Sequence, residues 1–513
     1  MTDVAGNAAT WFVDRHPGEG RGDKVAFREA GGGRSLSYQG LAEGSGQVAA
    51  ALRRAGVRPE ERAAMLVTDT IEFPQIFFGA LKCGVVPVPL NTLLAAPVYD
   101  AILRDCRATV LFVSEALFDT ISSVLKGHPT LRVIIVNSDR APEGCTSFDA
   151  FLRNAGTLET QPASDDEVAF WLYSSGSTGQ PKGVPHVHSA MKATADTYGA
   201  HILGLREDDV VFSAAKLFFA YGLGNAMTFP LAAGATTVLF AGRPTPADML
   251  AVMTAEQPTV FCGVPTLYAA MVAGMDKAGT PATLLRRAIS AGEALPEDVG
   301  MRWEAHTGVA ILDGVGSTEM LHIFLSNRAG DNVYGTSGVA VPGYDMRLVD
   351  ETGTEVGDDE IGELLVRGAS AAAGYWNQRK KSRTTFEGEW TRTGDKYERR
   401  KDGRYVYCGR TDDMFKVSGI WVSPFEVEQA LVSHPAVLEA AVVAAPGEDG
   451  LDKPKAFVVL QDAADSGIAE HLKEHVKDRI GKWKYPRWIS IVDELPKTAT
   501  GKIQRFRLRG AGQ

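Results

Sequence analysis

The chain has 513 residues, of which 45% are hydrophobic and 23% are charged, a composition typical of globular proteins that argues against a disordered or fibrous one. The length favours about three folding units. The 53 lysines and arginines and 63 aspartates and glutamates give a net charge of −10, which disfavours nucleic acid as the main partner.

The cysteines and the first residues bear on the cellular compartment. The five cysteines are odd in number and show no C-x-x-C spacing. This pattern indicates reduced thiols without a zinc cluster, as in a cytoplasmic protein. The first residues, 1–4, do not begin a basic segment that is followed by an apolar one, so we expect no signal peptide.

Several short apolar runs alternate with a helical pattern in the first half of the chain. The predicted strands are residues 63–67, 109–114, 133–137 and 236–240. Between them, residues 38–55 predict a helix with Ser37 as N-cap and Gly56 just beyond its end. The alternation favours α/β layers with largely parallel sheets. The polar stretch 139–167 is interpreted as a surface connection.

Residues 217–242 carry no charge and are long enough to span a bilayer. However, glycines and Pro230 interrupt the stretch, and a lipid-exposed helix would leave backbone groups unpaired at such breaks. We therefore expect no membrane association, and interpret the stretch as a buried loop, helix and strand beside a ligand pocket.

A domain boundary is predicted near residue 412, which separates residues 1–411 from residues 412–513. Before it, residues 362–366 and 403–407 predict strands of an antiparallel sheet. After it, Ser423 caps a predicted helix that begins at Pro424. The rest of a small α+β unit follows, with strands at 440–443, 456–460 and 489–492 and a helix at 468–480.

The strongest local motif is residues 173–183, which contains four serine and threonine hydroxyls, three glycines and a lysine after a strand-like run at 168–173. Glycines let backbone N–H groups approach a ligand closely, and such loops bind phosphate. The spacing does not match a Walker A loop. A mobile Ser/Gly linker is the alternative, and the position between a strand and a Pro-Lys-Gly turn disfavours it.

Three further motifs are weaker when taken singly. Residues 313–319 place a carboxylate after a Gly-rich turn, where it could hold Mg²⁺ on a nucleotide, or they simply start a capped helix. Residues 393–395 and 409–413 offer aspartate and arginine to a sugar or phosphate, or are ordinary turns. Residues 496–502 offer a mobile lysine to a cleft, or belong to a solvated basic tail.

Taken together, the order and spacing of these motifs resemble the adenylate-forming superfamily of acyl- and aryl-CoA synthetases over residues 25–509. Within that superfamily the chain is most similar to the benzoate-CoA ligase and hydroxybenzoate-CoA ligase family. The segments that carry this resemblance are residues 170–179, 214–225, 316–324, 414–420 and 495–505.

The resemblance implies a fold and a reaction. The expected α/β fold has a large N-terminal adenylation domain of layered α/β subdomains plus a β-barrel-like subdomain, followed by a small mobile α+β C-terminal domain with its hinge at Asp412. The expected substrates are ATP with Mg²⁺, an aromatic carboxylic acid and coenzyme A. The acid attacks the α-phosphate to give an acyl-adenylate and pyrophosphate, and CoA then displaces AMP.

The resemblance also implies residue roles at the nucleotide. Thr318 contacts the α-phosphate, Glu319 holds Mg²⁺, and Asp395 binds the ribose with Arg410 beside it. The phosphate loop contributes Ser174, Ser175, Ser177, Thr178 and Lys182. The adenine slot is formed by Ser290, Ala291, Gly292, Glu293, Asp313 and Val315, and Val315 stands where many members carry an aromatic residue.

The implied C-terminal domain supplies different residues to each half-reaction. Lys502 bridges the carboxylate and the α-phosphate during adenylation. Rotation about Asp412 then replaces it with the segment 416–420, in which Lys416 and Gly419 lie beside CoA.

The implied acid pocket leaves the choice of acid open. Its members are Phe219, Ala220, Tyr221, Val264, Gly314, Gly316, His322 and Ile323. A satisfied core histidine is the competing interpretation of His322. Val264 and Leu267 are larger than the residues expected in benzoate-selective relatives, so they narrow or reshape the pocket. Benzoate and its hydroxy and amino derivatives are therefore all retained.

Two other functions compete with the ligase. A stand-alone adenylation enzyme would load an aryl acid onto a carrier protein instead of CoA. A non-catalytic scaffold would be expected to lose Lys502, Glu319 or Asp395, and all three are present. A homodimer and a lysine acetyltransferase acting on Lys502 are kept as further expectations, the second because acetylation would remove the charge of Lys502.

Overall fold

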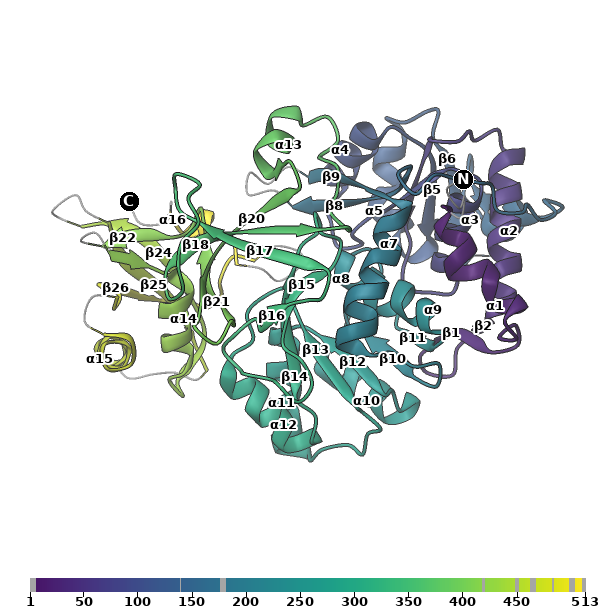
Figure 1. Ribbon diagram of the computed structural model, residues 1–513. Helices are drawn as coiled ribbons and strands as arrows, with labels where there is room; N and C mark the ends of the chain where they lie inside the picture. Colours follow the sequence, from purple (N-terminus) through teal and green to yellow (C-terminus); the bar gives the residue numbers. More distant parts are fainter. Residues whose placement is uncertain are drawn as a thin grey trace. The chain divides into compact units, whose positions relative to one another are not determined.

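The computed structural model describes residues 6–138, 140–175, 181–417, 420–447, 452–461, 467–481, 484–497 and 503–509 (Figure 1). The chain forms two compact units, residues 1–346 with 366–391 and residues 347–365 with 392–513. It passes between them within strands β17 (Tyr344–Val349), β18 (Ile361–Gly368) and β20 (Trp390–Arg399).

The first sheet of the larger unit is parallel, with strand order β4-β3-β5-β6-β7. Its strands are β3 (Arg62–Leu66), β4 (Val86–Pro89), β5 (Ala108–Ser114), β6 (Arg132–Val136) and β7 (Thr146–Ser147). The helices around it are α2 (Tyr38–Arg54), α3 (Glu72–Lys82), α4 (Ala96–Cys106), α5 (Glu115–Leu125) and α6 (Phe148–Leu152). Buried apolar residues of α4 and α5 form one core with those of β3–β6.

The second sheet has the order β16-β15-β14-β13-β12-β10-β11-β1-β2 and is parallel from β14 to β1. Its strands are β1 (Val25–Glu29), β2 (Ser35–Ser37), β10 (Val210–Ser213), β11 (Thr236–Leu239), β12 (Val260–Gly263), β13 (Arg287–Ser290), β14 (Ile311–Gly316), β15 (Ile323–Ser326) and β16 (Val339–Ala340). Helices α10 (Pro246–Glu256), α11 (Pro265–Ala278) and α12 (Glu297–Thr307) share a core with β10–β14 and lie beside them in Figure 1.

Short helices and a hairpin complete the larger unit. The helical segments are η1 (Thr10–Asp14), α1 (Arg15–Gly18), α7 (His188–Thr194), η2 (Ala195–Leu203), α8 (Ala220–Leu223), η3 (Gly224–Thr228) and α9 (Phe229–Ala233), where η marks π-helix. Strands β8 (Val168–Ser175) and β9 (Pro181–Val187) form an antiparallel hairpin. Helix α13 (Arg379–Thr385) and strand β19 (Phe386–Glu387) follow later in the chain.

The smaller unit contains both antiparallel and parallel strand pairs. Strand β21 (Tyr405–Arg410) pairs with β20, and β22 (Phe415–Val417) pairs with β23 (Ile420–Val422). A sheet of order β24-β25-β26 contains β24 (Val437–Pro446), β25 (Asp452–Leu460) and β26 (Trp488–Ile491). Its helices are α14 (Pro424–Val432), α15 (Ile468–Ile480) and α16 (Arg505–Arg509).

Most of the elements predicted from local sequence are confirmed. The Ser37 hydroxyl accepts from the Gly40 amide at the start of α2, and Gly56 follows the helix with φ of 77°. The Ser423 hydroxyl caps α14 in the same way. The predicted helix 468–480 has the bounds of α15, and the largely parallel sheets are also confirmed.

Two interpretations of loops are wrong. The stretch 139–167 is not only a surface connection, because it forms β7 and α6, where Phe148 and Phe151 pack edge-on against Phe112. Residues 393–395 and 409–410 are not isolated turns, because they lie on β20 and β21.

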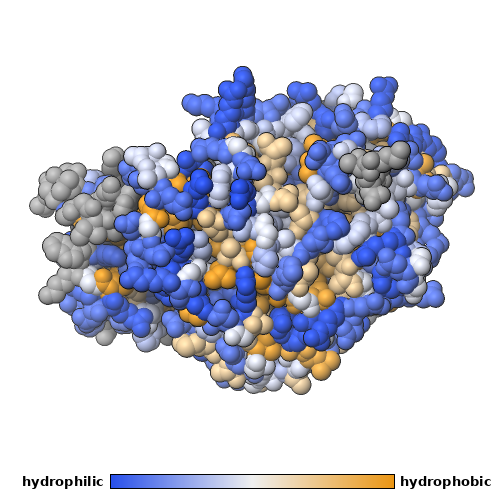
Figure 2. Space-filling view, in the orientation of Figure 1, coloured by the Kyte–Doolittle hydropathy of each residue, from blue (hydrophilic) through white to orange (hydrophobic). Residues whose placement is uncertain are grey.

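The charge-free stretch 217–242 folds as predicted, into a loop, the short helices α8, η3 and α9, and strand β11. Within the described ranges, no helix is long and apolar enough to cross a bilayer. Figure 2 shows a mainly hydrophilic face in which apolar residues gather in smaller areas.

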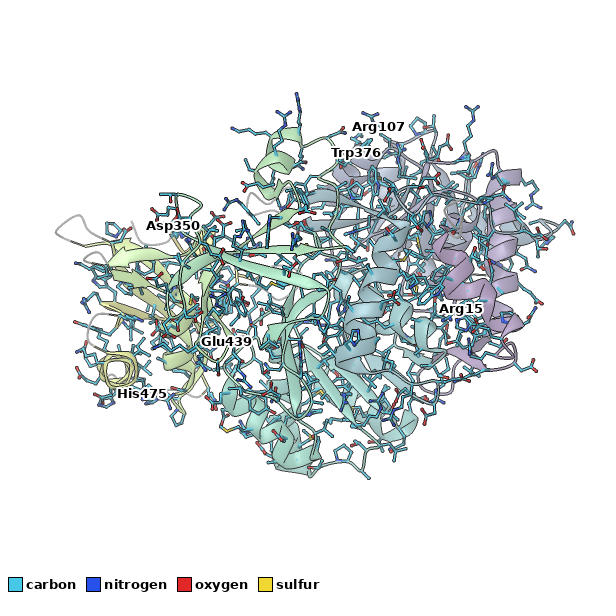
Figure 3. The ribbon with its side chains drawn as sticks, viewed as in Figure 1. Arg15, Arg107, Asp350, Trp376, Glu439 and His475 are labelled. Carbon is cyan, nitrogen blue, oxygen red and sulfur yellow. The ribbon has the colours of Figure 1, made fainter. Side chains whose placement is uncertain are left out.

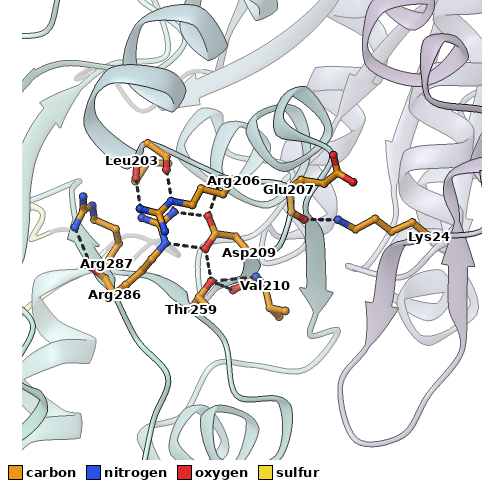
Figure 4. A network of polar contacts seen from close by, with 10 residues as sticks. Lys24, Leu203, Arg206, Glu207, Asp209, Val210, Thr259, Arg286 and Arg287 are labelled. Carbon is orange, nitrogen blue, oxygen red and sulfur yellow. Dashed lines mark hydrogen bonds and ion pairs between the residues drawn. The ribbon is translucent and has the colours of Figure 1, made fainter. Parts of the chain in front are cut away.

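One buried carboxylate joins three parallel strands at their amino ends (Figure 4). Asp209 precedes β10, and its Oδ1 accepts from Thr259 Oγ1 and from Arg286 Nε, each at 2.7 Å. Thr259 and Arg286 precede β12 and β13, and the Arg206 amide donates to Asp209 Oδ2 at 2.7 Å. Burial opposes the charge of Asp209, yet the bonds from Arg286 and Thr259 keep its pKa below the usual value.

The Asp209→Asn variant is expected to lower the free energy of unfolding by about 3 kcal/mol, because it removes one partner of a buried ion pair and leaves the Arg286 charge uncompensated. Urea denaturation at pH 7 measures this change. The control is Asp196→Asn, which breaks a pair with Lys192 whose two side chains are about half exposed. It should cost less than about 1 kcal/mol, and equal losses in both variants would contradict the role of Asp209.

Candidate functional site

The hairpin β8–β9 holds the stems of the predicted phosphate loop. Its register pairs Ser174 with Lys182 and Tyr173 with Gly183. The Ser174 hydroxyl is buried and has no hydrogen-bond partner among the described residues. Ser177, Thr178 and the side chain of Ser175 lie outside the described part of the structure.

The motif 313–319 begins on a strand, so its interpretation as a helix start is wrong. Asp313, Gly314, Val315 and Gly316 belong to β14, and β15 returns antiparallel beside them. A Cβ on Gly314 would lie 2.7 Å from the Leu325 oxygen, and one on Gly316 would lie 2.5 Å from the His322 oxygen. Both glycines are therefore required by the close approach of the β15 side.

Thr318 and Glu319 follow β14 in a turn that is fixed from several sides. The Ser317 hydroxyl accepts from the Met320 amide at 3.1 Å. The His186 ring Nε2 lies 2.9 Å from the Thr318 oxygen, which ties the turn to β9. Burial lowers the pKa of His186 to about 4, so the neutral ring donates this bond. The structure thus brings Thr318 and Glu319 together with the strand that carries Lys182.

The predicted adenine slot has a polar wall at the carboxyl ends of two neighbouring strands. Ser290 at the end of β13 pairs with Asp313 on β14. Asp313 Oδ2 accepts from the Leu295 amide at 3.4 Å, and Asp313 Oδ1 has no partner among the described residues. Burial raises the pKa of Asp313 to about 8. A carboxyl group that is protonated at neutral pH can both donate to and accept from a base edge.

The remaining members of the predicted adenine slot are Ala291, Gly292 and Glu293, which follow β13, and Val315 on β14. Ala291 is buried, and Gly292 has φ of 99°, a conformation that favours glycine. Glu293 is exposed, and Val315 is half-buried. Their contacts with a nucleotide stay predictions.

The predicted acid pocket contains a group of packed aromatic rings. The Tyr221 hydroxyl donates to the carbonyl oxygens of Gly263 and Ile289 at 3.0 and 3.2 Å. The His322 ring stacks on Tyr221 with centroids 5.8 Å apart, and it also packs against Tyr198 at 4.8 Å and Phe229 at 4.6 Å. Tyr198, Tyr221 and Phe229 come from the helical segments η2, α8 and α9, and His322 comes from a turn about 90 residues further along the chain.

His322 is buried, and burial lowers its pKa to about 3, so it is neutral at physiological pH. Neither ring nitrogen has a hydrogen-bond partner within the described ranges. The interpretation as a satisfied core histidine therefore has no bond to support it, and substrate contact stays the prediction.

The other predicted pocket residues differ in exposure. Phe219, Ala220 and Val264 are half-buried, whereas Ile323 is buried. Leu267 is only 8% exposed and belongs to the core shared with β10–β14. It can affect the pocket through Val264, which packs against the same core.

In the smaller unit, Asp395 and Arg410 face each other across β20 and β21 and form an ion pair at 2.9 Å. Asp412 follows β21, and its carbonyl oxygen accepts from Arg509 at 3.1 Å. Its role as a hinge stays a prediction. Gly419, Lys502 and the side chain of Lys416 lie outside the described residues.

Sequence reasoning missed Tyr375, whose hydroxyl donates to Glu319 Oε1 at 2.7 Å. It also left out Tyr198 and Phe229, which pack on His322. His186 and His188 follow the phosphate loop and are both buried. None of these residues belongs to a recognisable motif, so only the fold reveals their contacts.

Comparison with known proteins defines the class of this chain. The family model described as AMP-binding enzyme matches residues 14–376, and that of the AMP-binding enzyme C-terminal domain matches residues 426–502. The chain belongs to the AMP-binding enzyme family, as the resemblance predicted.

Individual relatives are similar over nearly the whole chain. A 4-hydroxybenzoate–CoA/benzoate–CoA ligase of Rhodopseudomonas palustris is 54% identical over 98% of this chain and 94% of its own length. The crystal structure of a benzoate CoA ligase from Burkholderia xenovorans LB400 is 48% identical, with a TM-score of 0.90 over 98% of this chain and 99% of that one. The anthranilate CoA ligase AuaEII, solved with anthranoyl-AMP, is 43% identical, with a TM-score of 0.93 over 98% and 97%. The predicted α/β fold with a large N-terminal and a small C-terminal domain is confirmed.

The Gly224→Ala variant tests the ring group, because a Cβ at Gly224 would lie 2.5 Å from His322 Cδ2 and 2.9 Å from Phe229 Cζ. We expect His322 to shift and kcat/KM for the aromatic acid to fall at least about tenfold, while KM for ATP stays unchanged. Steady-state kinetics with each substrate varied in turn measures both. Gly274→Ala on α11 is the matched control, because its Cβ would meet nothing closer than 3.7 Å. Equal kinetic constants in the two variants would contradict the assignment of His322 to the acid pocket.

Proposed function

We propose that the chain is an ATP-dependent, AMP-forming aryl-CoA ligase acting on benzoate or a substituted benzoate. The similarity to the Rhodopseudomonas palustris ligase over nearly the full length of both chains carries this proposal. The site supports it, because the stacked rings of Tyr221 and His322 and the hairpin β8–β9 lie in the same unit as Thr318 and Glu319.

The reaction has two displacement steps. A carboxylate oxygen of the acid attacks the α-phosphorus of ATP, and the bond to pyrophosphate breaks to leave an aryl-adenylate. The sulfur of CoA then attacks the acyl carbon, its proton passes to solvent, and AMP leaves with the former carboxylate oxygen. Both steps need charge neutralisation and orientation more than acid–base catalysis.

Residues of both units are assigned to the first step. Lys182 and the hydroxyls of the hairpin neutralise the β- and γ-phosphates, and Thr318 orients the α-phosphate. Asp313 donates to or accepts from the adenine edge in its protonated form. Asp395 and Arg410 bind the ribose, and Lys502 bridges the acid and the α-phosphate before the segment with Lys416 and Gly419 takes its place.

Glu319 fits a magnesium ion held mainly by the nucleotide. Within the described residues, no group of three or more His, Cys, Asp or Glu side chains could hold a metal ion. Mg²⁺ in nucleotide sites usually takes one or two carboxylates together with phosphate oxygens. When bound, the ion would supply positive charge that offsets the charge of the phosphate groups.

The acid pocket favours a flat, neutral ring. His322 remains uncharged at neutral pH and therefore presents a ring face without a localised charge. Tyr221 is oriented by two backbone carbonyls, so its ring forms a fixed wall. Benzoate, hydroxybenzoates and 2-aminobenzoate all fit this description, and the choice among them is left to measurement.

Two further proposals are that the chain forms a homodimer and that a lysine acetyltransferase acetylates Lys502.

The direct test is AMP formation with ATP, Mg²⁺ and CoA over a panel of acids. The panel contains benzoate, 2-, 3- and 4-hydroxybenzoate, 2-aminobenzoate, cyclohexanecarboxylate and octanoate. We expect CoA-dependent turnover with at least one aromatic acid and little with octanoate. Pyrophosphate exchange without thioester would indicate a carrier-loading enzyme instead, and preference for octanoate would contradict the proposal.

A further inference from the structure

Residues 370–376 form a strap that contacts both phosphate-handling parts of the larger unit. The Ser370 hydroxyl donates to the Met320 oxygen at 2.7 Å, and the Ala372 amide donates to the Glu319 oxygen at 2.8 Å. At its other end, the Trp376 amide donates to the Gly183 oxygen at 2.9 Å. The strap therefore joins the turn that carries Glu319 to the strand that carries Lys182.

Both ends of the strap are held by further contacts. The Ser370 hydroxyl lies 2.7 Å from the Tyr344 hydroxyl. Trp376 donates from its ring Nε1 to the Asp105 oxygen at 3.0 Å and packs on Trp171 at 4.7 Å. Figure 3 shows Trp376 beside Arg107, whose guanidinium lies 5.9 Å from the ring centroid. These contacts restrict the movement of the residues between them.

Tyr375 lies within the strap and contacts both functional side chains. Its hydroxyl donates to Glu319 Oε1 at 2.7 Å, and its ring centroid lies 4.8 Å from the Lys182 ammonium. Only 8% of the residue is exposed, and the ring is further packed against Phe386 at 5.3 Å. The Ser382 hydroxyl accepts from the Tyr375 amide at 2.9 Å, which fixes the backbone. One aromatic residue thus contacts the predicted metal ligand and the predicted phosphate ligand.

We propose that Tyr375 is a positioning residue for the metal-bound triphosphate, an inference that rests on the proposed function. Its phenol hydroxyl fixes the orientation of the Glu319 carboxylate by occupying one lone pair of Oε1, which leaves Oε2 as the main oxygen for the ion. Its ring face holds the Lys182 ammonium by a cation–π contact, at a fixed position relative to that carboxylate. Tyr375 therefore couples the placement of the Lys182 ammonium to that of the Glu319 carboxylate, the proposed ligand of the metal ion.

The alternative is that Tyr375 only stabilises the fold. If its role were only structural, replacing Tyr375 would lower the stability of the protein without weakening the binding of one particular ligand. A positioning role instead predicts weaker binding of the metal–nucleotide, with the binding of the aromatic acid and the second half-reaction left intact. The two roles can therefore be separated by measurements that do not depend on overall activity.

The first test is Tyr375→Phe, which keeps the ring on Lys182 and removes only the hydrogen bond to Glu319. We expect the affinity of the enzyme–ATP complex for Mn²⁺, measured by electron paramagnetic resonance of the free ion, to fall about tenfold. KM for MgATP should rise by a similar factor. KM for the acid, and thioester formation from supplied aryl-adenylate, should stay unchanged.

Tyr334→Phe is the matched control, because the Tyr334 hydroxyl also donates to a glutamate, Glu304, at 2.9 Å outside the site. It should leave the Mn²⁺ affinity unchanged. A thermal unfolding midpoint is recorded for each variant to confirm that it folds. Tyr375→Leu additionally removes the ring from Lys182, and we expect it to raise KM for MgATP beyond the value of Tyr375→Phe.

Glu319→Gln separates failure of this inference from failure of the proposed function. If Glu319→Gln weakens Mn²⁺ binding and Tyr375→Phe does not, the role of Tyr375 is wrong and the metal assignment stands. If neither variant changes Mn²⁺ binding, the assignment of Glu319 as metal ligand is wrong, and the inference about Tyr375 fails with it.

Discussion

The geometry of the larger unit depends on the bonds that the buried Asp209 carboxylate makes with its neighbours. It aligns the amino ends of β10, β12 and β13 through the side chains of Thr259 and Arg286. Rigid parallel strands transmit this alignment to their carboxyl ends, where ligands bind in open α/β sheets. At those ends the Tyr221 hydroxyl binds the carbonyls of Gly263 and Ile289. The position of the predicted acid pocket, at the carboxyl ends of these strands, thus depends on a hydrogen-bond network at their amino ends.

The phosphate side of the site is organised by hydrogen bonds between segments rather than by one motif. His186 on β9 holds the Thr318 oxygen, and the strap 370–376 holds Glu319 from the other direction. Because these bonds reach the backbone as well as the side chains, the turn 317–320 has little freedom to move. Pre-organised charges need not be rearranged when the triphosphate binds, which is how electrostatic catalysis gains most of its effect.

The sequence could predict whatever depends on local chemistry. Helix α15 was predicted with its observed bounds, because its periodicity and following glycine act within one segment. The contacts that orient the site join distant segments, such as Tyr375 with Glu319, and no local pattern records them. The strand pairing of Asp395 with Arg410 could not be read from either motif alone, since each resembled a turn, and only the family resemblance placed the two residues together. The roles implied for the site residues came from family resemblance, and the structure adds their neighbours.

The central claim is that the acid is activated as an adenylate before it reaches CoA. The most direct measurement uses benzoate, or the best acid of the panel, with both carboxylate oxygens labelled with ¹⁸O, followed by mass spectrometry of AMP, pyrophosphate and thioester. We predict one labelled oxygen in AMP, one in the thioester and none in pyrophosphate. Unlabelled AMP would contradict the account, because it would mean that the acid never bonds to the α-phosphorus.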